Sequence, residues 1–219
     1  MQTRPRGKEI HVFVMPEGEF LDRKNNMTIS CKEALIECLK ADSKNYKSQV
    51  HSWKDRLKCN LTSTPISEQK HIWAYIKHMR YVEYYSTMKD KNRIYLFPYL
   101  YHLKMLRKES HITGFQIEPG TCDKGLTIWH WGSIIVNGGA RLGENCTLYP
   151  GVLIGQKTQH GGNAIIGSNV FIGSGTKIIG AVKIGDNVTI GQNCVIVKDI
   201  EEGQTVVMNH NPRIINRKE

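Results

Sequence analysis

The sequence of 219 residues lacks the features that mark several large classes of protein. It has no long apolar run, so no transmembrane helix is predicted and no membrane insertion is expected. Its six cysteines form no C-x-x-C pair, which argues against a zinc site or a disulfide framework and favours reduced thiols. The apolar stretch near the N-terminus is too short for a secretory signal. We therefore expect a cytoplasmic protein.

A dense basic run is also missing, although the net charge is +10. Residues 1–110 hold 21 Lys or Arg against 12 Asp or Glu, whereas residues 111–219 hold 9 against 8. The basic residues of the first half are scattered among acids, and no nucleic-acid recognition motif accompanies them. This pattern favours a solvated helical surface and predicts no nucleic-acid partner.

Glycine is scarce before residue 111, and helix signals dominate there. Ser30-Cys-Lys-Glu33 has the pattern of a capping box. We expect a helical N-terminal domain over residues 1–110, weakly patterned over 1–26, then a β domain over 111–210 and a short basic tail over 211–219. The predicted helices run from Ser30 to Ala41, from Tyr46 to Lys58, from a Ser67 cap to Met88, and from Leu96 to Lys108; Ile10 to Met15 is a candidate extended segment. The last helix is expected to dock this domain onto the β domain.

The second half of the chain repeats with a period of six. Seven of the ten repeat positions are followed directly by glycine. The repeat positions are Leu142, Leu148, Ile154, His160, Ile166, Ile172, Ile178, Ile184, Ile190 and Ile196.

A period of six fits neither a helix stripe nor a lone amphipathic strand, but it fits a three-faced coil whose turns stack into a prism. The aliphatic residue points inward, and we expect the glycine to turn the corner, often with positive φ. The sequence therefore predicts a mainly β fold, a left-handed parallel β-helix of hexapeptide repeats, preceded by helices. The coils should begin near Ile117 and close at Asn209 to Pro212.

Two features interrupt the regular prism. The first is Ile128-Trp-His-Trp-Gly-Ser-Ile134, where His130 stands between two tryptophans. The second is the polar loop Gln156-Lys-Thr-Gln-His-Gly-Gly-Asn163, where His160 replaces the expected aliphatic residue. A polar loop on a tight solenoid suggests a functional role.

The stretch Ile128-Trp-His-Trp-Gly-Ser-Ile134 is followed by an eight-residue step to Leu142-Gly-Glu-Asn and then by Tyr-Pro-Gly-Val-Leu-Ile-Gly155, and this series resembles the serine acetyltransferase group of hexapeptide acyltransferases. The resemblance covers about residues 96–210. It implies acetyl transfer from acetyl-CoA to a hydroxyl, without a metal, and the family's catalytic histidine falls on His130. An imidazole suits this role because it can take the proton of a hydroxyl as that hydroxyl attacks the thioester.

This sequence departs from the family's pattern at two sites. The family's aspartate that orients the histidine falls on Gln116, so the acceptor for His130 is either Glu118, on the same side of the strand, or a backbone carbonyl. The Arg-His pair that helps bind the serine carboxylate falls on Gly162 and Asn163. This favours a sugar hydroxyl, of a surface polysaccharide or its precursor, over serine, which stays as the alternative. The candidate acceptor-binding residues are Trp129, Trp131, Tyr149 and His160.

Coenzyme A in this family lies in a groove between adjacent β-helices. The matching positions are Gly155, Gly173-Ser174-Gly175 and Gln192, and Lys177 and Lys198 are the candidate phosphate contacts. Because the groove needs two chains, the resemblance implies a homotrimer, with a dimer of trimers left open.

Other classes remain as alternatives: a non-catalytic hexapeptide scaffold, an N-acetyltransferase acting on an amino sugar, and a zinc enzyme of the carbonic-anhydrase type. The zinc enzyme would need three histidines at ligand geometry. His130 and His160 have no third member in the coils, since His210 lies at the closing end.

Overall fold

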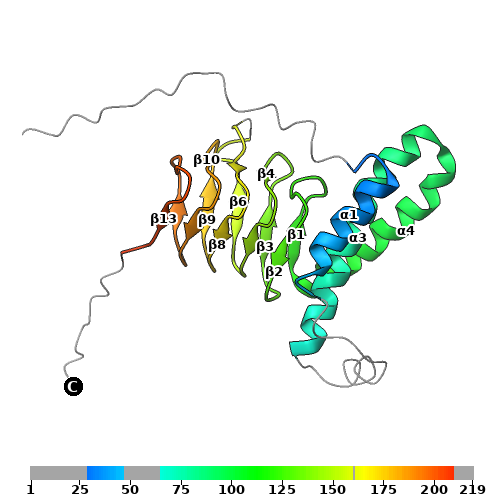
Figure 1. Cartoon of the computed structure of the whole chain (residues 1–219), viewed down its shortest axis with the longest axis horizontal. Coiled ribbons are helices and arrows are strands. Elements are labelled where there is room, and N and C mark those ends of the chain that lie inside the picture. Colours follow the sequence, from blue (N-terminus) through cyan, green and yellow to red (C-terminus); the bar gives the residue numbers. More distant parts are fainter. Residues whose placement is uncertain (1–28, 47–64, 160, 210–219) are drawn as a thin grey trace, which may run out of the picture.

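The computed structural model describes residues 29–46, 65–159 and 161–209. Figure 1 shows an elongated molecule with the helices at one end and a stack of short strands leading away from them. The helices are α1 (Lys32–Ser43), α3 (Pro65–Lys91), the 3-10 helix η2 (Arg93–Tyr95) and α4 (Leu96–Thr113). The described part of the chain contains no helix that is both long and apolar enough to cross a membrane.

The strands form three parallel sheets, the faces of a prism. Sheet A has the order β1-β3-β6-β9-β12, sheet B β10-β7-β4, and sheet C β13-β11-β8-β5-β2. This is the predicted left-handed parallel β-helix preceded by helices. The strands are β1 (Phe115–Ile117), β2 (Thr127–Ile128), β3 (Ile134–Val136), β4 (Arg141–Leu142), β5 (Thr147–Leu148), β6 (Leu153–Gly155), β7 (Ile165–Ile166), β8 (Phe171–Ile172), β9 (Lys177–Ile179), β10 (Lys183–Ile184), β11 (Thr189–Ile190), β12 (Val195–Ile196) and β13 (Thr205–Val206).

The inward residues stack on one another from coil to coil. Leu148 is level with Ile172, and Ile172 with Ile190, and none of the three side chains is accessible to solvent. Each inward position therefore buries a whole aliphatic side chain, which stabilises the fold by about 1.5–3 kcal/mol per residue. The period of six in the sequence is the spacing from one face of the prism to the next.

The glycines that follow the inward residues have a different role from the one predicted. Gly143, Gly167 and Gly185 do not have positive φ. A Cβ atom on Gly143 would lie 2.7 Å from the backbone of Gly167, and one on Gly185 would lie 2.5 Å from the backbone of Glu202. Glycine is required there because the next coil passes too close for any side chain. The positive φ angles of the corners fall instead on other glycines and on Asn145, Asn169, Asn187 and Asn193.

The polar loop is an insertion of one hexapeptide. Leu142 pairs with Ile166, 24 residues later, whereas Ile166 pairs with Ile184, 18 residues later. The loop leaves the prism after β6 and the chain returns at β7, so the count of six continues across it. His160 itself lies outside the described residues.

The helices differ from the predicted ones mainly at their ends. Cys31, not Ser30, is the N-cap of α1, and its Sγ accepts from the Ala34 N–H. Helix α3 begins at Pro65, so Ser67 lies inside its first turn. Strand β1 begins two residues before Ile117. The helix predicted from Tyr46 to Lys58, apart from Tyr46, and the segment from Ile10 to Met15 lie outside the described residues, as does the chain beyond Asn209.

The first coil is docked on the helices by side chains that bond to its backbone. The Tyr46 hydroxyl accepts from the Ile128 N–H at 2.6 Å and donates to a carbonyl two residues earlier. The Tyr75 hydroxyl of α3 both donates to the Ile117 carbonyl and accepts from the Ile117 N–H, each at 3.0 Å. Burial raises the pKa of both hydroxyls, which keeps them protonated donors. Docking thus uses side chains of α1 and α3 and Tyr46, together with the end of α4, the helix predicted to dock, whose Thr113 carbonyl accepts from the Gly132 N–H at 2.8 Å.

Arg80 of α3 is the centre of this docking surface. Its guanidinium is buried and bonds Asp42 at 2.8 Å and Glu83 at 3.1 Å. It also donates to the carbonyls of Cys122 and Asp123, each at 2.7 Å. The two carboxylates in turn accept N–H groups of the first coil, from Gly120, Gly125 and Leu126.

Removing this guanidinium should destabilise the whole molecule. We expect Arg80→Ala to lower the free energy of unfolding by about 3–5 kcal/mol, because it leaves two buried carboxylates without their cation. Arg80→Lys should rescue only part of this, because an ammonium cannot reproduce the planar fork. Urea denaturation followed by circular dichroism measures the change. The exposed Lys40→Ala on α1 is the control, expected within about 0.5 kcal/mol of the parent. An Arg80→Ala protein as stable as this control would contradict the role given to Arg80.

Candidate active site

His130 lies in a corner of the β-helix that is longer than the others. The chain turns from sheet C to sheet A at residues 129–133, 149–152, 173–176 and 191–194, which we call the C–A corners. Val136 is level with Ile154, so the first corner takes eight residues from Ile128, whereas the next takes six from Leu148. The two extra residues let the segment from Trp129 to Trp131 bulge outward beside the helices.

The His130 side chain is open to solvent on one side and faces a carboxylate on the other. It is 63% exposed, and its Nδ1 lies 3.5 Å from Oε1 of Glu68, in the first turn of α3. Its ring centroid is 6.4 Å from that of Tyr149, in the next C–A corner. With Nδ1 toward the carboxylate, Nε2 is the nitrogen left to meet a substrate.

Helix α3 also holds the backbone on both sides of His130. The Gln69 amide donates to the Trp129 carbonyl at 2.6 Å, and the Trp131 N–H donates to Glu68 Oε1 at 2.6 Å. The Trp131 ring stacks on His71, whose Nδ1 is 2.7 Å from Glu109 of α4. The position of His130 therefore depends on the first turns of α3 as much as on the β-helix.

Such an arrangement suits a general base. A carboxylate beside one nitrogen of an imidazole fixes its orientation and stabilises the cation that forms when the other nitrogen takes a proton. The exposed Nε2 side leaves room for an acceptor hydroxyl.

The carboxylate beside His130 is not the one predicted. Glu118 is exposed and follows β1 at the turn from sheet A to sheet B, where its N–H donates to the Val136 carbonyl. Gln116 lies on the outer face of sheet A, level with Ile135. No described contact joins either residue to His130. Glu68 was missed because it is far from His130 in the sequence and follows only a candidate helix cap.

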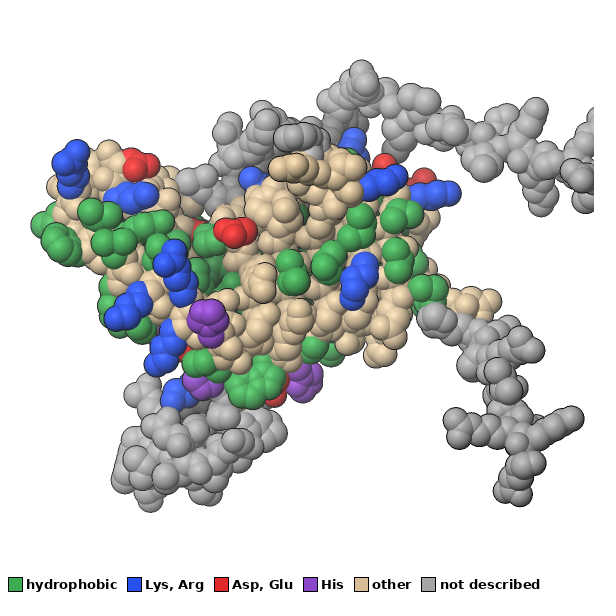
Figure 2. Space-filling model, turned by 180° about the vertical axis from the view of Figure 1, so that it is seen from behind, with side chains coloured by type: hydrophobic (Ala, Val, Ile, Leu, Met, Phe, Trp, Pro, Cys, Tyr) green, Lys and Arg blue, Asp and Glu red, His purple; other side chains and the backbone are tan. Residues whose placement is uncertain are grey.

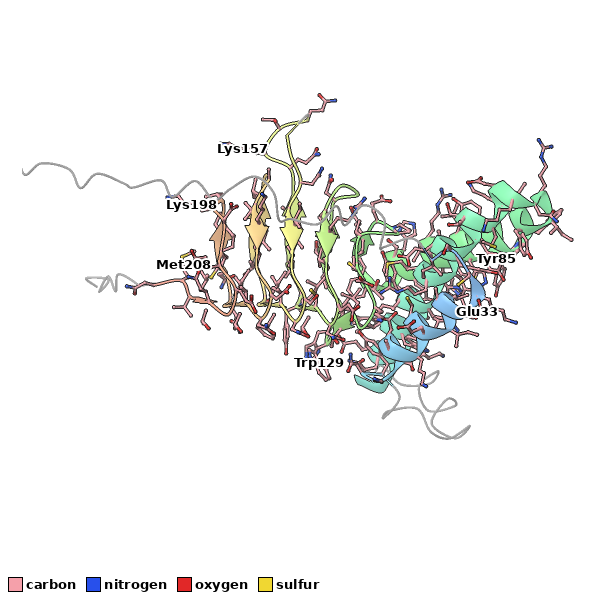
Figure 3. The ribbon with its side chains drawn as sticks, turned by 45° about the horizontal axis from the view of Figure 1, so that its top comes forward. Glu33, Tyr85, Trp129, Lys157, Lys198 and Met208 are labelled. Atoms are coloured by element: carbon pink, nitrogen blue, oxygen red, sulfur yellow. The ribbon has the colours of Figure 1, made fainter. Side chains whose placement is uncertain are left out.

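The three aromatic candidates share the corner with His130. Trp129 is 41% exposed and Trp131 is 40% exposed, whereas Tyr149 is half-buried against Phe171. The polar loop lies at another corner, between sheets A and B. Figure 3 shows Lys157 of that loop on the opposite side of the prism from Trp129. One protomer therefore does not bring the loop to His130.

The predicted coenzyme A residues divide between the same two corners. Gly173, Ser174, Gly175 and Gln192 lie in C–A corners, along the edge that begins at His130. Gly155 ends β6 in sheet A, and the exposed Lys198 lies at the corner between sheets A and B (Figure 3).

Several of these groups already have partners within the protein. The N–H groups of Gly173 and Gly175 donate to the carbonyls of Ile190 and Pro150, and the Ser174 hydroxyl also donates to Pro150. Any contact of this corner with a ligand must therefore use its remaining groups.

Lys177 is held in the same way. Its Nζ donates to the carbonyls of Gly151 at 2.8 Å and Gly175 at 2.9 Å, so two of its three donors close a corner of the prism. Among the described residues, no three His, Cys, Asp or Glu side chains are grouped so that they could hold a metal ion.

Comparison with known proteins identifies others that have similar repeats and a similar fold. Residues 163–198 match the family model of the bacterial transferase hexapeptide (six repeats). No curated protein matches the chain. Among solved structures, serine acetyltransferase isoform 3 of Entamoeba histolytica, in complex with cysteine, is 25% identical, with a TM-score of 0.54 over 84% of this chain and 62% of that one.

Two further structures share the fold. Neisseria gonorrhoeae serine acetyltransferase, in complex with serine, is 24% identical, with a TM-score of 0.53 over 80% of this chain and 67% of that one. The soybean serine acetyltransferase apoenzyme is 22% identical, with a TM-score of 0.58 over 81% and 67%. The chain is thus similar in repeats and fold to serine acetyltransferase-like hexapeptide acyltransferases, as its sequence predicted, and it spans only about 62–67% of the length of these relatives.

The contacts of Lys177 lead to a test that separates stability from ligand binding. We expect Lys177→Met to lower the free energy of unfolding by about 1–2 kcal/mol, because two partly buried carbonyls lose their donor. The exposed Lys198→Met should change it by less than about 0.5 kcal/mol. Urea denaturation of both variants decides between the roles. An unchanged stability of Lys177→Met, with weaker acetyl-CoA binding, would return Lys177 to the predicted role of phosphate contact.

Proposed function

We propose that this protein transfers an acetyl group from acetyl-CoA to the hydroxyl of an acceptor, with His130 as the general base. The observation that carries the proposal is the pairing of His130 with Glu68 in a bulged corner of a hexapeptide β-helix. The likeness to serine acetyltransferases supports the same class of reaction.

The reaction would be a direct transfer. Nε2 of His130 takes the proton of the acceptor hydroxyl as the oxygen attacks the thioester carbon. The tetrahedral intermediate then expels the coenzyme A sulfur, which receives the proton back from the imidazolium. The Glu68 carboxylate stabilises the imidazolium between these two steps.

For the acceptor we propose a sugar hydroxyl, with serine as the second candidate. Trp129 and Trp131 present partly exposed rings beside His130, and flat aromatic faces suit the apolar face of a pyranose. The position of the family's carboxylate-binding histidine is taken by Asn163, whose side chain accepts from Gln156 at 3.0 Å. Serine is favoured by the solved relatives, one of which is a complex with serine.

We also propose that the active protein is a homotrimer. From β3 to β12 the outer face of sheet A is lined mainly by aliphatic side chains, with Lys177 as a polar exception, whereas a solvated strand face is usually polar. A second copy against this face would cover it, and closed threefold symmetry would cover the same face on all three chains. The loop of one chain would then lie nearer the His130 corner of its neighbour. The outward residues are Ile135, Leu153, Ile179, Val195 and Val197.

The first test is the release of free coenzyme A from acetyl-CoA, measured with a thiol reagent. The acceptors are L-serine, homoserine, hexoses and amino sugars. We expect one acceptor to be preferred, and His130→Ala to lower kcat/KM by about 10²–10⁴ because the general base is lost. Circular dichroism checks that the variant folds.

The outcomes separate the alternatives. A clear preference for serine would contradict the sugar proposal but keep the reaction class. Wild-type activity in His130→Ala would exclude the histidine as the base. A protein that does not bind acetyl-CoA would exclude the enzyme and favour a non-catalytic scaffold.

A second test compares the two carboxylates that have been considered for orienting His130. Glu68→Gln keeps an oxygen for the Trp131 N–H but removes the charge beside His130. We expect kcat to fall by about threefold to tenfold with little change of acceptor KM, a modest effect because water screens this exposed pair.

Glu118→Gln is the matched control in the same assay, because it makes the same chemical change in an exposed residue away from His130. Its kcat should stay at the wild-type value. Equal losses in the two variants, or a loss in Glu118→Gln alone, would contradict the assignment of Glu68.

A further inference from the structure

The end of the helical hairpin formed by α3 and α4 carries an exposed apolar cluster that the proposed acetyl transfer does not use. Phe97 is 77% exposed and Ile94 is 66% exposed, which is unusual for such large side chains when they lie together. We call this cluster the hairpin tip. Its members are Ile94, Leu96, Phe97, Leu100 and Tyr101.

The hairpin tip lies on one face of α4, which continues as a basic surface. Phe97, Leu100, Tyr101, Lys104 and Lys108 follow helical spacing, so their side chains share the side of α4 that faces away from the helices packed against it. The basic residues start one to two turns after the apolar ones, about 10 Å along the helix axis. The outer face of α4 thus changes from apolar to basic over a short distance.

The chain segment that carries the hairpin tip is strongly basic. Residues 84–108 hold six Lys or Arg and a single acid, Asp90, for a net charge of +5. Lys89 is half-buried, with its ammonium 4.4 Å from the centroid of the Tyr99 ring. Figure 2 shows the apolar patch at the helical end of the molecule, bordered by Lys and Arg side chains. The five exposed basic residues are Lys91, Arg93, Lys104, Arg107 and Lys108.

We propose that the hairpin tip and its basic border form a docking surface for the anionic surface of a lipid bilayer. An apolar cluster that includes Phe97 and Tyr101 can enter the region between headgroups and acyl chains, where aromatic side chains are enriched. Lysines and arginines a short distance behind it meet the lipid phosphates, each contributing to binding in an anionic leaflet. This is adsorption to one leaflet through a helix end.

The positive charge around the hairpin tip argues against a second copy of the chain as the partner that binds there. A twofold contact through the hairpin tip would bring two groups of exposed cations together, with Asp90 as the one acid of this segment to offset them. An anionic bilayer complements both parts of the surface, since it takes up the apolar cluster and neutralises the basic border.

The test uses the full chain and sedimentation with vesicles. We expect the wild type to bind vesicles of phosphatidylcholine mixed with phosphatidylglycerol, to bind pure phosphatidylcholine vesicles far more weakly, and to be released as the NaCl concentration rises. Two double variants probe the two parts of the surface: Phe97→Ser with Leu100→Ser, and Lys104→Glu with Lys108→Glu. Each should weaken binding by about tenfold or more.

Matched controls change other exposed residues in the same way. Val207→Ser with Met208→Ser removes exposed apolar groups from the far end of the β-helix, and Lys32→Glu with Lys40→Glu changes the net charge on α1 by the same amount as the tip variant. Both should bind the mixed vesicles like the wild type. All substituted side chains are exposed, and circular dichroism checks the fold of each variant.

Three results would overturn the proposal. One is a wild type that does not bind the mixed vesicles, and another is tip variants that bind them as well as the controls do. The third is tip variants that keep vesicle binding but have a smaller molar mass by light scattering, which would assign the hairpin tip to a contact between copies. None of these readouts depends on acetyl transfer.

Discussion

The first coil of a β-helix has no coil before it, and the structure depends on how its unpaired backbone groups are satisfied. An exposed row of such groups invites pairing with another chain. Here side chains of α1 and α3, with Tyr46 after α1, bond them in sequence around the prism. Tyr75 bonds the backbone of sheet A, and Arg80 and Glu83 bond the backbone of the corner that follows it. Tyr46 bonds the backbone of sheet C, and Asp42 bonds the corner before that sheet. The helices replace the missing coil.

These hydrogen bonds between the helices and the first coil continue as far as the candidate active site. After Tyr46 has bonded Ile128, the next backbone groups of the first coil belong to Trp129 and Trp131, and Gln69 and Glu68 bond them. The side chain that closes the coil is therefore also the carboxylate beside His130. The stability of the contact between the helices and the first coil is thus coupled to the geometry of the proposed base, because both depend on how α3 lies on that coil.

The sequence predicted what local spacing encodes. The period of six predicted the prism, because each inward Ile or Leu is set by its own repeat. The sequence placed the eight-residue step between Ile134 and Leu142, whereas the structure has it between Ile128 and Val136, around His130. It could not identify Glu68, because that contact joins a helix and a coil 62 residues apart with no pattern linking them. It also misjudged the glycines after the inward residues: the closeness of the next coil at Gly143 depends on stacking, which a single repeat does not reveal.

The two proposed surfaces lie at opposite ends of α3, and this limits what the acceptor can be. Glu68 lies near the start of the helix and Lys91 is its last residue. A helix that stands perpendicular to the bilayer would separate them by about 35 Å. A bilayer held at the hairpin tip would then be out of reach of His130 for a short lipid-linked sugar. Membrane docking and acetyl transfer are therefore compatible if the acceptor is soluble, or if it is a longer saccharide chain that extends back from the lipid to the corner of the β-helix.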